Sequence, residues 1–180
     1  MRVVSGPIGK ERIHFEAPPA ERIGQEMDHF LDWWHSSKGN IEGLVRAAVC
    51  HFWFVTIHPF EDGNGRIARA LTDMAFAQDD GQRQRYFSMS SQIMRERNSY
   101  YDILEASQKG TCDITQWLVW FLECFSRAIE NSEKVLSGIT AKAAFWRRHA
   151  QVSLSERQRK VINRLLDAGQ GGFEGGLTTR

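Results

Sequence analysis

The hydrophobic residues of this chain follow a helical spacing over most of its length. From Ala20 onward, apolar side chains recur at intervals of three and four residues, in the series Ile23, Met27, Phe30, Leu31 and Trp34. This spacing predicts a helix with one buried face. A polar, glycine-containing break at residues 36–40 ends that helix. The stretch 41–57 that follows is apolar on nearly every side, which predicts a helix buried in the core.

Helical spacing continues toward the C-terminus. It returns at residues 66–78 and again at 92–108. Asp113 with Gln116 forms a capping pattern before a strongly amphipathic helix. A separate helix is expected at about 134–149.

The first residues predict extended chain instead. Two short extended pieces within residues 3–16 flank the turn residues Gly6, Pro7 and Gly9, so a β-hairpin is expected there. The Ala-Pro-Pro run at 17–19 ends the extended chain and can start a helix. The fold class is therefore mostly α, with one hairpin near the N-terminus.

The composition is that of a globular protein without a strong net charge. Of 180 residues, 42% are hydrophobic and 25% charged, and 23 Lys and Arg against 22 Asp and Glu give a net charge of +1. No overall basic field favours nucleic acid as a partner. Three widely spaced cysteines form no disulfide framework, the N-terminus lacks a signal-peptide core, and no apolar stretch is long enough to cross a bilayer. These features favour an intracellular, cytoplasmic protein.

The candidate chemistry lies at residues 58–69, His-Pro-Phe-Glu-Asp-Gly-Asn-Gly-Arg-Ile-Ala-Arg. Gly63 and Gly65 precede a predicted helix, where exposed backbone N–H groups and the first helical turn form an anion site. Arg66 and Arg69 lie three residues apart and project to one side of that helix. Two guanidinium groups beside an anion site suit a polyphosphate.

Two further residues of this stretch supply a metal ligand and a base. A carboxylate at Asp62 would repel phosphates unless a divalent cation lay between them, and Mg²⁺ binds one carboxylate together with phosphate oxygens. His58 begins the stretch and can serve as a base near neutral pH.

Each of these residues also has an interpretation without function. Asp-Gly-Asn-Gly at 62–65 is a strong turn signal. Arg69 could pair with Asp73 on the helix surface. His58 before Pro59 could end a helix with its imidazole satisfied in the core.

Two other ligand-binding loops fit the stretch poorly. An EF-hand calcium loop fails because its first position would be Phe60 and its twelfth Leu71. A dinucleotide fingerprint is nearly met from Gly63 onward, but it needs a strand directly before it and a parallel sheet around it. The chain shows no alternating βαβ pattern, so this alternative ranks low.

The combination resembles the signature of the Fic (filamentation induced by cAMP) family, His-x-Phe-x-[Asp/Glu]-Gly-Asn-Gly-Arg-x-x-Arg. All eight fixed positions are met, by His58, Phe60, Asp62, Gly63, Asn64, Gly65, Arg66 and Arg69. Such a match arises by chance on the order of once in a billion random windows. The resemblance covers most of residues 1–150 and implies a Fic-type helical bundle whose N-terminal hairpin is the family's flap.

The resemblance implies a protein adenylyltransferase, which moves AMP from ATP to a hydroxyl of a target protein. By match, His58 would be the general base that takes the proton from that hydroxyl. Asp62 would hold Mg²⁺. Phe60 would be buried in the core and anchor the loop.

The resemblance also implies which residues contact the phosphates. Gly63, Asn64 and Gly65 would lie against the α- and β-phosphates. Arg66 and Arg69 would hold the β- and γ-phosphates of the leaving pyrophosphate.

The nucleoside contacts implied by the resemblance come from a later helix. Tyr101 and Gln108 would flank the base and ribose, although the family commonly has Asn where this chain has Gln108. Packing of Tyr100 and Tyr101 in the core, with one hydroxyl in water, is the alternative.

The hairpin at 3–16 resembles the flap, which pairs with an extended segment of the target by strand addition. Its residues nearest the nucleotide would be Val4, Ser5 and Gly6. A hairpin that merely covers the core is the alternative.

One short pattern concerns inhibition. Ser126, Glu130 and Asn131 match the family's inhibitory motif, Ser/Thr-x-x-x-Glu-Gly/Asn. Because they lie on the amphipathic helix expected to be core scaffold, we expect the inhibitory helix elsewhere, upstream of Met1 or on a separate protein.

The last residues are expected to begin a second module. Ser153 and Glu156 form a capping box before an amphipathic helix. This helix resembles the first helix of a winged-helix module appended to some longer Fic proteins. The expected organisation is a Fic domain at 1–150 and a truncated helical module at 151–180, with no recognition helix that would support nucleic-acid binding.

The sequence therefore predicts a cytoplasmic adenylyltransferase that uses Mg²⁺ and ATP and modifies Tyr, Thr or Ser of a target protein docked along the flap. Self-modification and the absence of a membrane partner belong to the same hypothesis. Two alternatives stay open. One is a nucleotide-binding regulatory module without significant transfer. The other is the same fold with another nucleotide donor, because the phosphate-binding loop does not select the base.

Overall fold

The computed structural model describes residues 2–5, 12–80 and 85–168. The chain divides into two compact units, Met1–Ile129 and Glu130–Arg180, and each is described by itself. The sequence predicts two domains, 1–150 and 151–180, and this organisation stays a prediction. None of the described helices is both long and apolar enough to cross a lipid bilayer.

The expected N-terminal hairpin is present. Strands β1 (Arg2–Ser5) and β2 (Arg12–Glu16) pair antiparallel, with an irregularity in register between Val3 and Val4. The residues that would form its turn, 6–11, lie outside the described residues. Among the described residues these two strands form the sheet, and the remaining elements are helices, so the mostly α fold class is confirmed.

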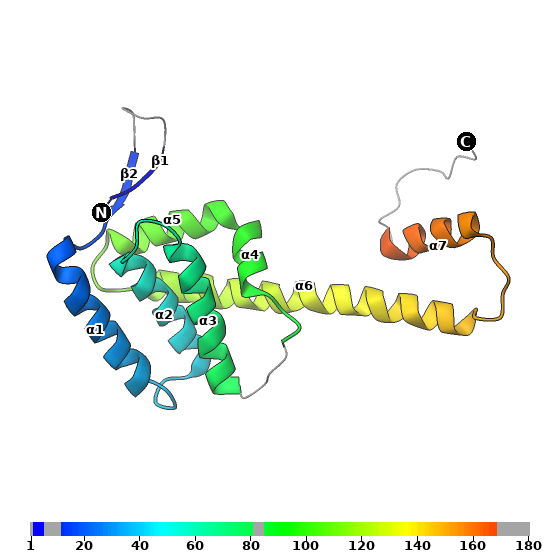
Figure 1. Cartoon of the computed structure of the whole chain (residues 1–180), viewed down its shortest axis with the longest axis horizontal. Helices are drawn as coiled ribbons and strands as arrows, with labels where there is room; N and C mark the ends of the chain where they lie inside the picture. The colour runs from blue at the N-terminus through cyan, green and yellow to red at the C-terminus, as the bar shows by residue number, and fades with distance from the viewer. Residues whose placement is uncertain (1, 6–11, 81–84, 169–180) are drawn as a thin grey trace. The chain divides into compact units, whose positions relative to one another are not determined.

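Helices account for most of the chain (Figure 1). Their bounds are α1 Ala20–Ser36, α2 Gly43–Ile57, α3 Asn64–Asp80, α4 Met89–Arg95, α5 Arg97–Gln108, α6 Thr115–Arg148 and α7 Glu156–Ala168. The division between the two units falls within α6.

Helix α2 lies in the core of the first unit, as its continuous apolar pattern predicts. It packs against α1 and α3 (Figure 1). Its buried residues are Arg46, Ala47, Ala48, Cys50, His51, Phe54, Val55 and Ile57. The fully buried Trp117 of α6 donates its indole N–H to the carbonyl oxygen of Ala48 at 2.9 Å, which satisfies the ring's polar atom inside the core.

The predicted helix at 92–108 is two helices, because the chain bends at Glu96. This residue has φ −101° and ψ 28°, outside helical geometry. Its carboxylate accepts hydrogen bonds from Nε and Nη2 of Arg127, both at 2.7 Å. These bonds from α6 lower the pKa of the Glu96 carboxyl. The bend therefore has a charged partner 31 residues away, which no local spacing reveals.

The prediction of a separate helix at about 134–149 is wrong, because the amphipathic helix that follows Asp113 continues through it as α6. No proline interrupts it, and a single glycine at Gly138 is tolerated inside a long helix. Its cap also differs from the expected pair. The carboxylate of Asp113 accepts from the backbone N–H and the hydroxyl of Thr115, at 2.9 and 2.6 Å, in place of Gln116.

The second unit contains the C-terminal part of α6 and the amphipathic helix α7. The capping box of α7 is formed by Ser155 and Gln158, two residues after the predicted pair. Within this unit Trp146 donates its indole N–H to Asn163 at 3.0 Å. None of the described α7 residues is buried, so its amphipathic pattern alone does not establish a core.

Candidate active site

The loop between α2 and α3 starts with an unusual backbone turn at His58. The residue before a proline is driven away from right-handed helical geometry, so α2 ends at Ile57. His58 adopts the left-handed region, with φ 52° and ψ 57°, which is uncommon for a residue other than glycine. Its backbone N–H still donates to the carbonyl of Phe54 at 3.1 Å. His58 therefore ends the helix and redirects the chain into the loop.

The imidazole of His58 is half-buried and held by its own helix. Its Nδ1 lies 3.3 Å from the carbonyl oxygen of Val55. A carbonyl can only accept, so Nδ1 carries the proton and Nε2 is the basic nitrogen. Burial lowers the pKa of His58 below 6.5, while the Val55 carbonyl opposes part of that shift. The ring is therefore neutral near pH 7, in the form that can accept a proton.

The expected burial of Phe60 is wrong, and Asn64 anchors the loop instead. The Phe60 side chain is 49% exposed, with its ring centroid 6.4 Å from that of Phe54. The Asn64 side chain is 3% exposed and binds the backbone of Phe60 twice. Its Oδ1 accepts from the Phe60 N–H at 3.1 Å, and its Nδ2 donates to the Phe60 carbonyl at 2.6 Å. Both polar atoms of the Asn64 side chain are therefore already hydrogen-bonded within the loop.

The two glycines of the loop make room for the two arginines. Gly63 has φ 86°, which a side chain would strain. A Cβ at Gly63 would lie 3.4 Å from Nη2 of Arg66, and one at Gly65 would lie 3.5 Å from Nη1 of Arg69. Each guanidinium group thus lies beside a backbone position that carries no side chain.

Asp62 and Arg66 are paired across one helical turn. Oδ2 of Asp62 lies 2.9 Å from Nη2 of Arg66, and both side chains are largely exposed. Oδ1 accepts from the N–H of Gly63 at 2.6 Å. Within the described ranges, no group of three or more His, Cys, Asp or Glu side chains could hold a metal ion by itself. The carboxylate of Asp62 fits Mg²⁺ only as one ligand beside phosphate oxygens.

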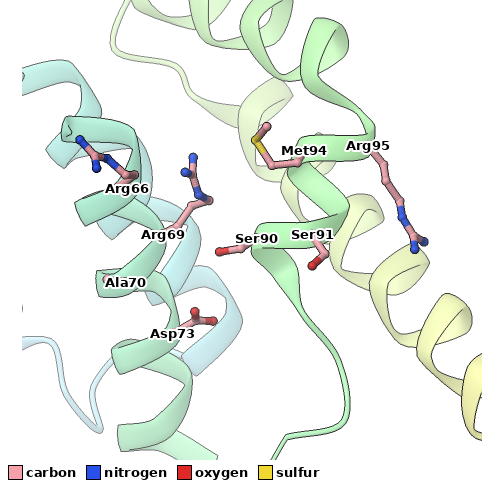
Figure 2. A pocket seen from close by; sticks show the side chains of 8 residues that line it. All are labelled: Arg66, Arg69, Ala70, Asp73, Ser90, Ser91, Met94 and Arg95. Carbon is pink, nitrogen blue, oxygen red and sulfur yellow. The ribbon is translucent and has the colours of Figure 1, made fainter. Parts of the chain in front are cut away.

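Arg66 and Arg69 line an open pocket of about 660 Å³ between α3 and α4 (Figure 2). Its remaining lining residues are Ala70, Asp73, Ser90, Ser91, Met94 and Arg95. Figure 2 shows Ser90 and Met94 directed toward α3, opposite Arg69. The sequence interpretation missed this second wall, because it began the next helix at residue 92, after Ser90 and Ser91.

The alternative pairing of Arg69 with Asp73 is absent. Among the described residues Arg69 forms no ion pair, whereas Asp73 lies 4.0 Å from Nη1 of Arg85. Burial raises the pKa of Asp73, and Arg85 lowers it in part. The guanidinium of Arg69 is therefore available to a ligand in the pocket.

The residues expected at the nucleoside lie on α5, away from the lining of this pocket. Tyr101 is 50% exposed, and the guanidinium carbon of Arg97 lies 5.6 Å from the centre of its ring. Gln108 donates from Nε2 to the hydroxyl of Thr56 at 3.1 Å, which ties α5 to the last turn of α2. Tyr100 is buried, as its core interpretation predicts. The nucleoside roles of Tyr101 and Gln108 stay predictions.

The described residues of the expected flap form a strand, and the residues of the inhibitory pattern lie on a helix. Val4 and Ser5 belong to β1, whereas Gly6 lies outside the described residues. Ser126 and Glu130 lie on α6, and Ser126 is exposed. Contacts of the flap with a nucleotide, and inhibition by α6, stay predictions.

The chain is similar to known Fic proteins. Residues 3–76 match the model of the Fic/DOC family. The chain is 32% identical over 105 residues to the protein adenylyltransferase Fic of Aedes aegypti, a match that covers 58% of this chain and 19% of that protein. It is 32% identical over 115 residues to the protein adenylyltransferase Fic of Nematostella vectensis, covering 63% of this chain and 25% of that protein. The chain thus spans a quarter or less of the length of these curated relatives.

A solved structure shares the fold. The crystal structure of a Fic family protein from Desulfovibrio desulfuricans matches with a TM-score of 0.58 and 23% sequence identity. The match covers 92% of this chain and 43% of the other.

Proposed function

We propose that this chain transfers AMP from ATP to a hydroxyl side chain of a target protein and releases pyrophosphate, because residues 3–76 match the model of the Fic/DOC family. One observation carries the proposal. Arg66 and Arg69 line an open pocket at the start of α3, and the loop before it holds the neutral imidazole of His58. The relatives' printed name, protein adenylyltransferase, supports the reaction class.

The pocket suits the phosphates of ATP for electrostatic reasons. The first turn of α3, in which Gly65 carries no side chain, would offer backbone N–H groups to anionic oxygens. The N–H of Gly63 donates to Asp62 instead. Arg66 and Arg69 would bind the β- and γ-phosphates. Asn64 would act through its backbone alone, because its side chain is bound to Phe60. Charge that develops on the leaving pyrophosphate would then meet groups already in place.

His58 would accept the proton in the transfer step. The hydroxyl oxygen of the target attacks the α-phosphorus, and the bond from that phosphorus to the bridging oxygen of the β-phosphate breaks. The hydroxyl proton passes to Nε2 of His58, and the electron pair of the broken bond leaves with pyrophosphate. A positioned base of this kind contributes roughly 10²–10⁴-fold to a rate. The Val55 carbonyl keeps Nε2 as the accepting nitrogen.

Asp62 would hold Mg²⁺ in this proposal. When bound, Mg²⁺ would neutralise charge on the phosphate oxygens. Asp62 and Arg66, which are paired with each other, would then contact the ion and the phosphates respectively.

The nucleoside, the target and the cell compartment complete the proposal. Tyr101 and Gln108 would bind base and ribose, and the first strand of the hairpin, with Val4, Ser5 and Gly6, would face the nucleotide. An extended segment of the target would pair with the hairpin by strand addition. The modified side chain would be Tyr, Thr or Ser, on a target or on this chain itself, in the cytoplasm.

The decisive experiment is mass spectrometry of the purified chain, with and without cell lysate, after incubation with Mg²⁺ and ATP. A mass increase of one AMP on a side-chain hydroxyl, lost in His58→Ala, supports the proposal. Binding of ATP without any transfer would favour a regulatory nucleotide-binding module. The same incubation with UTP or GTP tests the alternative donors, and transfer from either of these alone would contradict ATP as the donor.

A further inference from the structure

A buried chain of hydrogen bonds joins three helices of the first unit behind the candidate site. His51 of α2 is fully buried. Its Nδ1 lies 2.9 Å from the hydroxyl of Thr72 on α3, and its Nε2 lies 3.0 Å from the hydroxyl of Tyr100 on α5. The Thr72 hydroxyl in turn donates to the carbonyl of Ala68 at 2.9 Å. We call these four residues the His51 chain.

The direction of each bond follows from counting hydrogens. Thr72 has one hydroxyl hydrogen, which goes to the Ala68 carbonyl, so toward His51 it can only accept. Nδ1 of His51 therefore carries a proton. Burial lowers the pKa of His51 to about 3, and the nearby charge of Arg69 acts in the same direction, so the ring is neutral. Nε2 is then an acceptor, and Tyr100 donates to it.

The His51 chain ends next to the residues that the proposed function uses. His51 lies on α2, seven residues before His58, which follows the end of that helix. Ala68 is the neighbour of Arg69 on α3, and Tyr100 is the neighbour of Tyr101 on α5. Helices α3 and α5, which carry Arg69 and Tyr101, are thus tied to the same imidazole of α2. The ring is also enclosed by aromatic side chains, with centroids of Trp117 at 5.5 Å and Phe121 at 6.2 Å.

We propose that His51 is a positioning residue, which fixes α3 and α5 against α2 through Thr72 and Tyr100 and so sets the place of Arg69 relative to His58. This inference rests on the proposed function. The physical reason is that a hydrogen bond between buried polar atoms forms only at a particular distance and direction. An apolar core tolerates sliding of one helix along another, whereas buried donors and acceptors lose their partners when the helices shift.

Variants of Thr72 and Tyr100 test the chain without removing the ring. In Thr72→Val the hydroxyl is replaced by a methyl group of similar size, so Nδ1 loses its acceptor. We expect His51 to change to the tautomer with the proton on Nε2, which then donates to the Tyr100 oxygen. Thr72→Ser should restore the original tautomer. Tyr100→Phe should keep the proton on Nδ1. Long-range ¹H–¹⁵N spectra of the imidazole report each tautomer directly.

A second measurement separates positioning from stability. Ile93 of α4 is buried, belongs to the core, and does not line the pocket, so Ile93→Val is a matched loss of stability outside the His51 chain. We expect Thr72→Val to weaken Mg·ATP binding and to slow self-transfer of AMP. The combined loss should be about tenfold, which equals about 1.4 kcal/mol. Each variant is assayed at the same number of degrees below its own melting temperature. Ile93→Val should then leave Mg·ATP binding and AMP transfer within twofold of wild type, and Thr72→Ser should restore both quantities.

The outcomes separate the two proposals. If Thr72→Val keeps the proton on Nδ1, the assigned bond directions are wrong and the His51 chain is overturned. If the tautomer changes but binding and transfer match those of Ile93→Val, the chain is only structural and the positioning role is overturned. If the wild type neither binds Mg·ATP nor transfers AMP, the proposed function fails and the positioning role fails with it, while the tautomer spectra still decide the bond directions.

Discussion

The side-chain amide of Asn64 satisfies both polar backbone atoms of Phe60, four residues earlier in the chain. The two bonds, at 3.1 and 2.6 Å, close the loop that joins α2 to α3. The side chain that makes them is almost fully buried. A residue that the family signature suggests for phosphate binding therefore acts as a structural brace of the loop.

Removal of this brace should loosen the loop. In Asn64→Ala the N–H and carbonyl of Phe60 lose their partners, so we expect the free energy of unfolding to fall by about 2 kcal/mol. Hydrogen exchange at the Phe60 amide should accelerate. Urea denaturation and exchange mass spectrometry measure the two effects. Asn64→Asp, which keeps the acceptor and loses the donor, should retain protection of that amide, and unchanged exchange in Asn64→Ala would refute the brace.

The role of His58 predicts a separation between binding and transfer. His58→Ala removes the accepting nitrogen but leaves the glycines and arginines in place, so transfer of AMP should fall by roughly 10²-fold or more. The affinity for Mg·ATP, measured by calorimetry, should change little. The exposed His35 of α1 provides the control, since His35→Ala should affect neither quantity. Equal loss of binding and transfer in His58→Ala would make His58 a structural residue.

Gly63 should tolerate a side chain poorly. Its φ of 86° costs about 1 kcal/mol in any residue with a Cβ. We expect Gly63→Ala to lower both stability and affinity for Mg·ATP. Gly24, inside α1, is the matched control, because a Cβ there would meet no atom within 4 Å. Gly24→Ala should instead stabilise the protein by about 0.5–1 kcal/mol, because alanine favours the helix. Equal effects of the two substitutions would contradict the argument.

The buried imidazole of His51 should make stability depend on pH. Its pKa is lowered from 6.5 to about 3 by burial, so below pH 6.5 the unfolded chain binds a proton that the folded chain excludes. The contribution of His51 is thus complete above pH 6.5 and is lost as the pH falls toward 3, by at most about 1.4 kcal/mol per pH unit. Urea unfolding between pH 4.5 and 7.5 measures the slope for the wild type and for His51→Gln. Identical slopes would show that His51 is protonated equally in both states.

Local spacing explains which parts of the fold were predicted correctly. The period of apolar residues in α1 and α2, and the short extended pieces that form β1 and β2, reflect backbone preferences that act within a few residues. The same spacing failed at Glu96. There a bidentate contact with Arg127 accompanies a bend that the helical pattern of 92–108 hides.

The sequence by itself determined that the chain is mostly helical and that a glycine-rich loop with two arginines follows a central buried helix, because these properties depend on residue type and short spacing. Only the tertiary structure decided that Phe60 lies at the surface, that α4 faces Arg69 across a pocket, and that His51 meets Tyr100. The last two residues are 49 positions apart. Which buried donor reaches which acceptor over such a separation depends on how the helices pack, and no pattern within a single helix contains that information.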